Sequence, residues 1–457
     1  MKISQFEFLS QRVTLMSLAL LLVGCATAPE IQRPTLSVPD AFQTRSTNPA
    51  QLIPAGKPWW NALGDAMLDK LVDTAFENNR DVSQAIARIE QARARTTDAR
   101  GAMKPQVGVG ALIERRDDGR DISATGNFNP TLHASYEADL FGRLRSAIKS
   151  SDASLRASEE DLAALKVSLA ADVVGAYLQL RYADLRLVVY GDRYNALRDL
   201  LAIDRVRLET GVTDASGLAR TQADLDQVIS DRAAAERERA EAEARLATLT
   251  ATPGLRIAAA GSTRLLPIPF ADTPAAVLRR RPDIRAAEAR LMAANAQAYQ
   301  AYAARFPGLT LSTSAGFAST QFHTVLERAS LSWAVSALLD ATLFDGGRRE
   351  AQQTGAMAQA REVAAATDAA VLRAMEEIET ALSAYEVEDR ALQAISDAFA
   401  QTQRLEKLAE TQRAAGAVGR QAVLEAKLAS QSAELNRLGH ERARQVAVVN
   451  AARALAL

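Results

Sequence analysis

Few residues of this 457-residue chain have the types and spacings that enzymes use. The three histidines lie far apart and lack the spacing of metal ligands: His133, His323 and His440. The sequence contains neither the Gly-x-x-x-x-Gly-Lys-Ser/Thr loop that binds nucleotide phosphates nor the Gly-x-Ser-x-Gly turn of serine hydrolases. Adjacent acids such as Glu159-Glu160 and Glu376-Glu377 are interpreted as solvated helix faces. We therefore expect no enzymatic activity, no metal site and no cofactor.

The one side chain with a clear chemical expectation is Cys25, the only cysteine. A charged start and the apolar run from Val13 to Val23 fit a secretory signal peptide over residues 1–24. That run is shorter than the ~20 residues of a membrane-spanning helix. Leu22-Val23-Gly24-Cys25 resembles the bacterial lipobox, in which the cysteine receives a covalent lipid. An incidental or buried cysteine is the alternative. Ala26, where an aspartate would favour inner-membrane retention, favours export to the outer membrane.

Composition limits the partners and indicates long helices. The formal net charge of −1 argues against a nucleic-acid partner, which would require a basic surface. The 14 prolines leave residues 131–252 and 308–457 free of proline, and both blocks are rich in strong helix formers. We predict helices over 143–208 and 347–414, each roughly 100 Å long at 1.5 Å per residue.

Each long helix is expected to turn back on itself. Gly211 and Gly416 follow the two predicted helices, and glycine suits a helix C-terminus. Thr213 or Asp214 can cap the next helix. We therefore predict antiparallel return helices over residues 215–250 and 420–455.

The two helical blocks are expected to be copies. Marks recur in the same order at shifts of 202 to 205 positions: Asp81 with Asp283, Pro105 with Pro307, Leu140-Phe141 with Leu343-Phe344, and Gly211 with Gly416. Solenoid repeats have periods of only about 20–50 residues. The sequence therefore predicts a tandem duplication of roughly 200 residues.

Two strands are predicted before each long helix. Apolar and polar residues alternate over four segments: 107–113, 132–140, 309–317 and 331–343. A membrane-crossing strand needs about 9–11 residues, with apolar side chains toward lipid and polar ones toward a lumen. A soluble antiparallel sheet with one wet face is the alternative.

Four strands cannot close a membrane barrel, because single-chain outer-membrane barrels have at least about 8 strands. An open sheet would leave unpaired edges that the bilayer does not tolerate. The barrel must therefore be shared between chains. Two chains would give a narrow, plugged barrel, whereas three chains of four strands would give 12 strands and a lumen.

Local motifs resemble those of one family. Trp59-Trp60 with Leu63-Gly64-Asp65, Gln32-Arg33-Pro34, the stretch 279–288 (RRRPDIRAAE) and Asp345-Gly346-Gly347-Arg348 are similar to segments of the outer membrane factor family, the TolC-like exit ducts. The lipidated start resembles its OprM or NodT-type branch of efflux lipoproteins. One departure is Val423-Leu424-Glu425-Ala426, where the family often has an aspartate.

The resemblance implies a fold and a function. The fold class is an α+β membrane protein with four transmembrane β-strands per chain, 12 in a homotrimer (three times four), continuing into a long α-helical barrel in the periplasm. The protein is expected to be lipid-anchored in the outer membrane of a Gram-negative bacterium. It would be the passive exit duct for small molecules in a tripartite efflux pump. Its partners would be a periplasmic membrane-fusion adaptor, an inner-membrane transporter of the RND type, and outer-membrane lipid.

Two other functions stay open. One is a type I secretion channel for proteins, and the other is a coiled-coil envelope scaffold without transport, which would account for the helices but not for the strands. The resemblance also divides the chain into a signal peptide (1–24), a lipidated segment and belt (25–80), a first repeat (81–252), a linker or belt (253–281) and a second repeat (282–457). Each repeat is expected to contain a helix, two strands and a long helical hairpin.

The hairpin turns are the expected functional sites. By resemblance, the adaptor docks there, at Thr210, Gly211, Val212, Ala415, Gly416 and Ala417. The mouth of the duct also closes there, and charged groups near helix ends could hold it shut. The candidate gate residues are Glu209, Asp214, Glu410, Arg413, Arg420 and Glu425. Ordinary solvated helix-end charges are the alternative, and an apolar constriction by Val212 or Val418 is another.

Overall fold

The computed structural model describes residues 39–42, 58–116, 125–212, 214–259, 264–266 and 273–457. The predicted signal peptide, Cys25 and Thr213 lie outside these ranges. Over these ranges the chain is mostly helical with one antiparallel sheet, and it divides into two compact units. The first unit contains residues 88–159 and 286–368, and the second contains 36–87, 160–285 and 369–457, so far as these are described.

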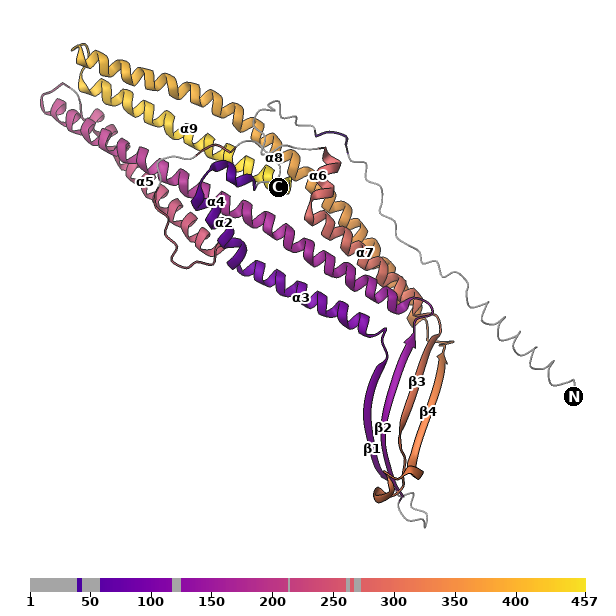
Figure 1. Ribbon diagram of the computed structural model, residues 1–457. Coiled ribbons are helices and arrows are strands. Elements are labelled where there is room, and N and C mark those ends of the chain that lie inside the picture. Colours follow the sequence, from indigo (N-terminus) through magenta and orange to yellow (C-terminus); the bar gives the residue numbers. More distant parts are fainter. Residues whose placement is uncertain (1–38, 43–57, 117–124, 213, 260–263, 267–272) are drawn as a thin grey trace, which may run out of the picture. The chain divides into compact units, whose positions relative to one another are not determined.

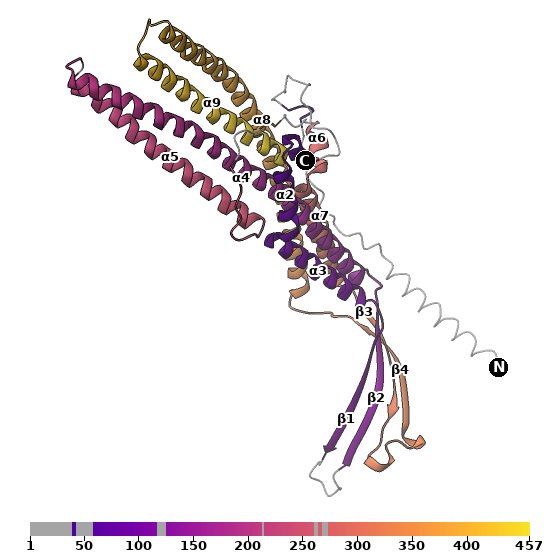
Figure 2. The same ribbon diagram turned by 60° about the vertical axis from the view of Figure 1, so that its left-hand side comes forward.

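The first unit holds the sheet, with the strands in the order β1-β2-β3-β4 (Figures 1 and 2). The strands are β1 (Gln106–Arg116), β2 (Thr125–Ala138), β3 (Gly308–Phe317) and β4 (Leu331–Asp340). All neighbouring pairs are antiparallel, and β2 pairs with β3, so the two sequence-distant hairpins form one sheet. The four predicted strands are therefore present. β2 begins seven residues earlier than expected, and β4 ends at Asp340 rather than at residue 343.

Short joints connect β2 and β4 to the long helices that follow them. The Asp139 carboxylate accepts hydrogen bonds from the backbone N–H groups of Leu144 at 3.1 Å and Arg145 at 2.9 Å. Asp345 likewise accepts from the N–H groups of Gly347 and Arg349, at 3.0 and 3.1 Å. These aspartates satisfy the free N–H groups at a helix N-terminus, so a strand can pass into a helix within a few residues.

Nine helical segments account for most of the residues that the structure describes. They are η2 (Trp59–Leu63), α2 (Ala66–Asn78), α3 (Arg80–Gly101), α4 (Arg143–Glu209), α5 (Ala215–Leu249), α6 (Pro274–Arg280), α7 (Pro282–Ala303), α8 (Arg348–Ala414) and α9 (Arg420–Ala454), beside two short turns, η3 (Phe322–Thr324) and η4 (Arg328–Ser330). α4 and α8 have 67 residues each, and α5 and α9 have 35 each. The predicted helix bounds agree within one residue. Within the described ranges, none of these helices is long and apolar enough to span a membrane.

The second unit has a core to which segments distant in sequence contribute. Trp59 and Trp60 of η2 meet edge to face, with ring centroids 5.8 Å apart. They pack in one cluster with buried side chains of α2, α4, α5 and α9 and with Ile257 and Leu266 of the connection between α5 and α6. The double-tryptophan motif and this connection are therefore held against the helical hairpins.

Candidate functional site

The two hairpin turns have the same backbone geometry. Gly211 and Gly416 adopt φ values of +72° and +76°, a left-handed conformation that favours glycine. The next N–H in each turn, of Val212 and Ala417, donates to the carbonyl five residues earlier at 2.8 Å. This pattern is the Schellman motif that ends helices. The six predicted docking residues are exposed on these two turns.

Of the six candidate gate residues, Arg420 makes a contact that joins the two helical hairpins. Its guanidinium lies 2.5 Å from the Asp199 carboxylate, which links α9 of the second hairpin to α4 of the first. Beside this ion pair, Leu200 and Leu424 belong to a small buried apolar cluster. Sequence reasoning missed Asp199, because the pair is separated by 221 positions.

The other candidates have local partners or none among the described residues. Glu425 accepts a hydrogen bond from Gln421, one turn earlier on α9, at 2.8 Å. Asp214 caps α5 by accepting from the N–H groups of Ser216 and Gly217. The Ser216 hydroxyl and these N–H groups lower the Asp214 pKa. Three other candidates, Glu209, Glu410 and Arg413, are exposed, and no ion pair or side-chain hydrogen bond joins them to another described residue. Arg420 and Glu425 therefore have different partners within one chain, Asp199 and Gln421.

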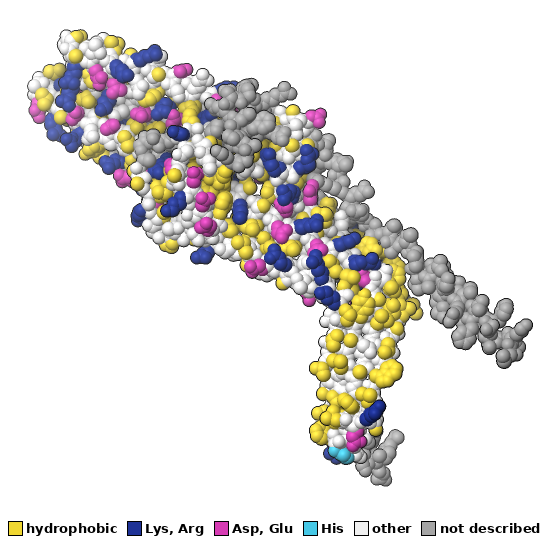
Figure 3. Space-filling view, in the orientation of Figure 1, with side chains coloured by type: hydrophobic (Ala, Val, Ile, Leu, Met, Phe, Trp, Pro, Cys, Tyr) yellow, Lys and Arg dark blue, Asp and Glu magenta, His cyan; other side chains and the backbone are white. Residues whose placement is uncertain are grey.

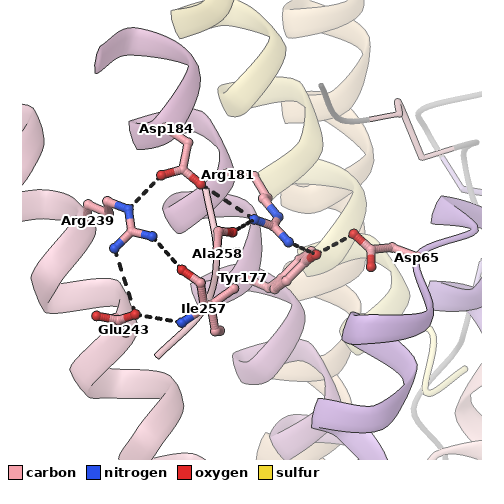
Figure 4. Close-up of polar contacts among 8 residues, drawn as sticks. All are labelled: Asp65, Tyr177, Arg181, Asp184, Arg239, Glu243, Ile257 and Ala258. Carbon is pink, nitrogen blue, oxygen red and sulfur yellow. Dashed lines mark hydrogen bonds and ion pairs between the residues drawn. The ribbon is translucent and has the colours of Figure 1, made fainter. Parts of the chain in front are cut away.

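A buried polar cluster links α4, α5 and the connection after α5 (Figure 4). Arg239 of α5 donates to the Asp184 carboxylate of α4 at 2.6 Å and to the Ile257 carbonyl at 2.6 Å. Glu243, one turn further along α5, accepts from the Ile257 N–H at 2.8 Å. The connection is therefore held by both its carbonyl and its N–H.

Arg181 of α4 extends this cluster toward the N-terminal segment. It donates to the Ala258 carbonyl at 2.7 Å and to the Tyr177 hydroxyl at 2.6 Å. Tyr177 in turn donates to Asp65, the residue that caps α2 (Figure 4). Burial, together with the hydrogen bond to Asp65, raises the pKa of Tyr177 to about 12. A phenol is protonated at neutral pH even at its ordinary pKa of about 10, so Tyr177 can act as the donor.

The second hairpin has a matching contact. Arg444 of α9 donates to the Asp389 carboxylate of α8 at 2.6 Å and to the Leu266 carbonyl at 3.0 Å. The adjacent Gln445 accepts from the Leu266 N–H at 2.9 Å. We call the pairs Arg239–Asp184 and Arg444–Asp389 the arginine clasps. The first clasp holds the connection between α5 and α6 at Ile257, and the second clasp holds it at Leu266.

The arginine clasps position the connection between α5 and α6 against the two hairpins. In the clasps, each guanidinium is occupied by carboxylate and carbonyl acceptors. Across the described part of the chain, no three His, Cys, Asp or Glu side chains gather in a way that could hold a metal ion. Of the adjacent acids, Glu160 is partly exposed and forms an ion pair with Arg285, and Glu377 is exposed and forms one with Arg281.

Comparison with known proteins places the chain in a family. The model of the outer membrane efflux protein family matches residues 71–252 and 273–457. The chain is 31% identical over 425 residues to the pyoverdine export outer membrane protein OpmQ of Pseudomonas putida, covering 90% of this chain and 89% of OpmQ. It is 29% identical over 458 residues to the outer membrane protein OprJ of Pseudomonas aeruginosa, covering 97% and 95%.

Structural comparison agrees with the sequence match. The open state of the MtrE outer membrane channel of Neisseria gonorrhoeae matches 94% of this chain and 98% of its own, with a TM-score of 0.81 at 26% identity. Sequence and structure thus point to one group of Gram-negative outer-membrane proteins. The chain belongs to the outer membrane efflux protein family, whose members are efflux ducts rather than enzymes.

Proposed function

We propose that three copies of this chain form the outer-membrane exit duct of a tripartite efflux pump, through which small molecules leave passively. The observation that carries the shared assembly is the pair of open sheet edges. Among the described residues, β1 and β4 each have one strand partner, whereas β2 and β3 have two. All ten residues of β4 are exposed.

An open sheet edge is costly in a membrane. Each unpaired backbone group in hydrocarbon costs several kcal/mol, so membrane strands occur in closed barrels. Four strands are too few for closure, whereas three chains contribute 12 strands (three times four), within the range of known barrels. Joining β4 of each copy to β1 of the next would remove every edge.

The sheet surface fits contact with lipid. Large apolar side chains are exposed along the edge strands, including Val107, Val109, Trp333 and Val335. On the face in Figure 3, hydrophobic and uncharged side chains cover most of the strands, while charged side chains are frequent over the helices. The polar alternates of β2, such as His133 and Ser135, would then face the lumen.

The helical part supports a tandem duplication as the origin of the duct wall. The paired helix lengths, the paired turns and the two arginine clasps recur at a shift of 205 positions. We propose repeats over 81–252 and 282–457. The segments 25–80 and 253–281 would form the belt beside the hairpins, so far as they are described.

The partners follow from the proposed place in the pump. An inner-membrane transporter would supply the energy, because this sequence contains no nucleotide-binding loop. A periplasmic adaptor would dock on the exposed turns at Gly211 and Gly416. OpmQ is named for pyoverdine export; for this chain we propose small-molecule cargo as a class. A lipid on Cys25 would add a membrane anchor.

The resting mouth of the duct is proposed to be held by exposed ion pairs. Arg420 with Asp199 is one such pair, with both side chains about half exposed. Exposed pairs contribute only ~0–1 kcal/mol each. A gate built from several such pairs could open without a large energy input.

Deleting the chain from its own host tests the function. The deletion strain should retain a fluorescent efflux dye, and the wild-type chain should restore dye release. A Ser314→Pro chain, in which proline interrupts the interior strand β3, should not restore it. Unchanged dye release with loss of a secreted protein would favour the type I secretion alternative. Release of the protein from membranes without detergent would favour the scaffold alternative.

A further inference from the structure

Two apolar side chains at the joint between β4 and α8 are almost fully exposed. Leu343 is 98% exposed and Phe344 is 90% exposed. At the matching joint between β2 and α4, Phe141 is covered, because its ring stacks on Phe306 with centroids 4.8 Å apart and planes inclined by 18°. The phenylalanine of the Leu-Phe motif is therefore partly covered in the first joint and bare in the second, whereas the leucine is exposed in both, Leu140 at 55%.

The covering residue has a counterpart elsewhere in the chain. Phe306 lies in the turn between α7 and β3, where its N–H donates to the Ala303 carbonyl at 3.2 Å. Lys104 lies in the turn between α3 and β1, where its N–H donates to the Gly101 carbonyl at 2.9 Å. A proline follows each residue, Pro307 and Pro105. Lys104 is thus the counterpart of Phe306, and it is exposed.

The sheet order determines which joint can be covered within one chain. Phe141 and Phe306 meet across the seam between β2 and β3, two neighbouring interior strands. The matching seam would lie between β4 and β1. These strands are at opposite edges of the four-stranded order, so one open sheet cannot bring them together. A β4–β1 seam therefore requires a second copy of the chain.

We infer that Phe344 packs on the Met103–Lys104 turn of a second copy of this chain. The contact repeats between chains what Phe141 and Phe306 do within one chain, and it rests on the shared assembly of the proposed function. Lys104 replaces an aromatic partner with an ammonium group on a long apolar stem. A cation within about 6 Å of a ring centroid attracts the ring face. Met103 adds a flexible thioether that packs well against aromatic rings.

The contact is directional, which matters for assembly. Phe344 of one copy meets Lys104 of the next, so the two surfaces differ, and each copy has both. Such head-to-tail contacts generate a ring when the rotation between copies closes. The joint would therefore lock neighbouring copies immediately beside the strand seam, where a gap would open the wall of the duct.

Cross-linking tests the contact. In purified protein, Phe344→Cys combined with Lys104→Cys should be joined by a short bismaleimide into two-chain and three-chain bands on a denaturing gel. Phe344→Cys alone and Lys104→Cys alone should each stay at the one-chain position. Because both variants retain Cys25, this result would also show that Cys25 does not form the cross-link. The matched control is Phe141→Cys with Phe306→Cys, which should lose its free thiols without leaving the one-chain position.

The outcomes separate the contact from the assembly. Chain-to-chain bands only in the Phe344–Lys104 double variant support the contact. A trimer by light scattering without these bands overturns the contact and leaves the shared duct standing. Protein that is monomeric by light scattering overturns the proposed assembly and this contact with it.

A second measurement does not depend on introduced cysteines. Phe344→Ala and Lys104→Ala should each lower the temperature at which the oligomer dissociates, and the double variant should lower it by less than the sum. Leu326→Ala is the control, because Leu326 is also exposed but lies between η3 and η4, away from the joint. Equal shifts for Leu326→Ala and Phe344→Ala, or additive effects in the double variant, would contradict the pairing.

Discussion

Arg239 on α5 and Arg444 on α9 make the same contact 205 positions apart. Each donates through Nε to an aspartate 55 residues earlier in the chain, at 2.6 Å, and each also donates to a carbonyl of the connection between α5 and α6. The Asp184 side chain is only 2% exposed, and that of Arg444 only 5%. These two arginines therefore tie the connection to both hairpins, which fits the proposed duplication.

Replacing Arg444 should release the connection. Arg444→Met keeps much of the side-chain volume but removes the donors to Asp389 and Leu266. Breaking a buried ion pair costs about 3–5 kcal/mol, and the partial exposure of Asp389 places the expected loss near the lower value. The thermal unfolding midpoint should fall, and trypsin should cleave faster after Arg264.

The matched control for this variant is Arg237→Met. Arg237 pairs with Glu241 on the exposed face of α5 at 3.6 Å, and such pairs contribute ~0–1 kcal/mol. If Arg444→Met resists heat and trypsin as well as Arg237→Met does, the clasp does not hold the connection.

Acid should weaken the joint between β2 and α4 through Asp139. Burial alone would raise the Asp139 pKa, but the N–H groups of Arg145 and Leu144 and the Arg145 guanidinium outweigh burial and lower it. Because the folded-state pKa is lowered, the stabilisation is present above the unfolded pKa of about 3.9. It is lost as the pH falls through the folded value.

The variant Asp139→Asn isolates this effect, because an amide can still accept a hydrogen bond but does not titrate. Loss of the negative charge beside the helix N-terminus should cost about 0.3–1 kcal/mol at neutral pH. The difference in unfolding midpoint between wild type and Asp139→Asn should shrink as the pH is lowered below about 4. A difference that stays constant across this range would show that Asp139 does not act as a charged cap.

The proposed gate predicts a change in conductance. Alanine at Arg413, Arg420 and Glu425 together should raise single-channel conductance in planar bilayers and sensitise cells to a large antibiotic such as vancomycin. Asp199→Ala alone should reproduce the effect of Arg420→Ala, since the two side chains form one ion pair. Wild-type conductance in the triple variant would favour an apolar constriction by Val212 or Val418.

Lipidation is tested at Cys25, which lies outside the described residues. Cys25→Ser should abolish labelling with radioactive palmitate while leaving much of the transport, provided that the signal peptide is still removed. Each buried CH₂ of a lipid adds ~0.8 kcal/mol to membrane binding, but the strands would already anchor the assembly. Persistent labelling of the variant would refute lipidation at this residue.

The regular elements were predictable because their signals are local. Proline-free, alanine-rich blocks defined α4 and α8, and Gly211 and Gly416 marked their ends, since only residues that tolerate a positive φ suit these positions. The end of β4 was misplaced because the alternating pattern continues to Leu343, although pairing stops at Asp340. Periodicity alone does not reveal where a strand loses its neighbour.

The contacts between distant helices were not predictable from one sequence. Asp184 and Asp389 look like ordinary charges on long helices, and only the packing of the hairpins brings Arg239 and Arg444 to them. Asp199 was missed for the same reason. Asp214 directly precedes α5, and this local signal allowed it to be predicted as a cap. Asp139 also caps its helix, but it was not predicted because it lies several residues before the start of α4.

The mass of the purified protein in mild detergent tests the central claim most directly. Light scattering, with the detergent mass subtracted, should give three times the mass of one chain, because each open sheet needs a neighbour at both edges. A monodisperse monomer under these conditions would contradict a duct shared between chains.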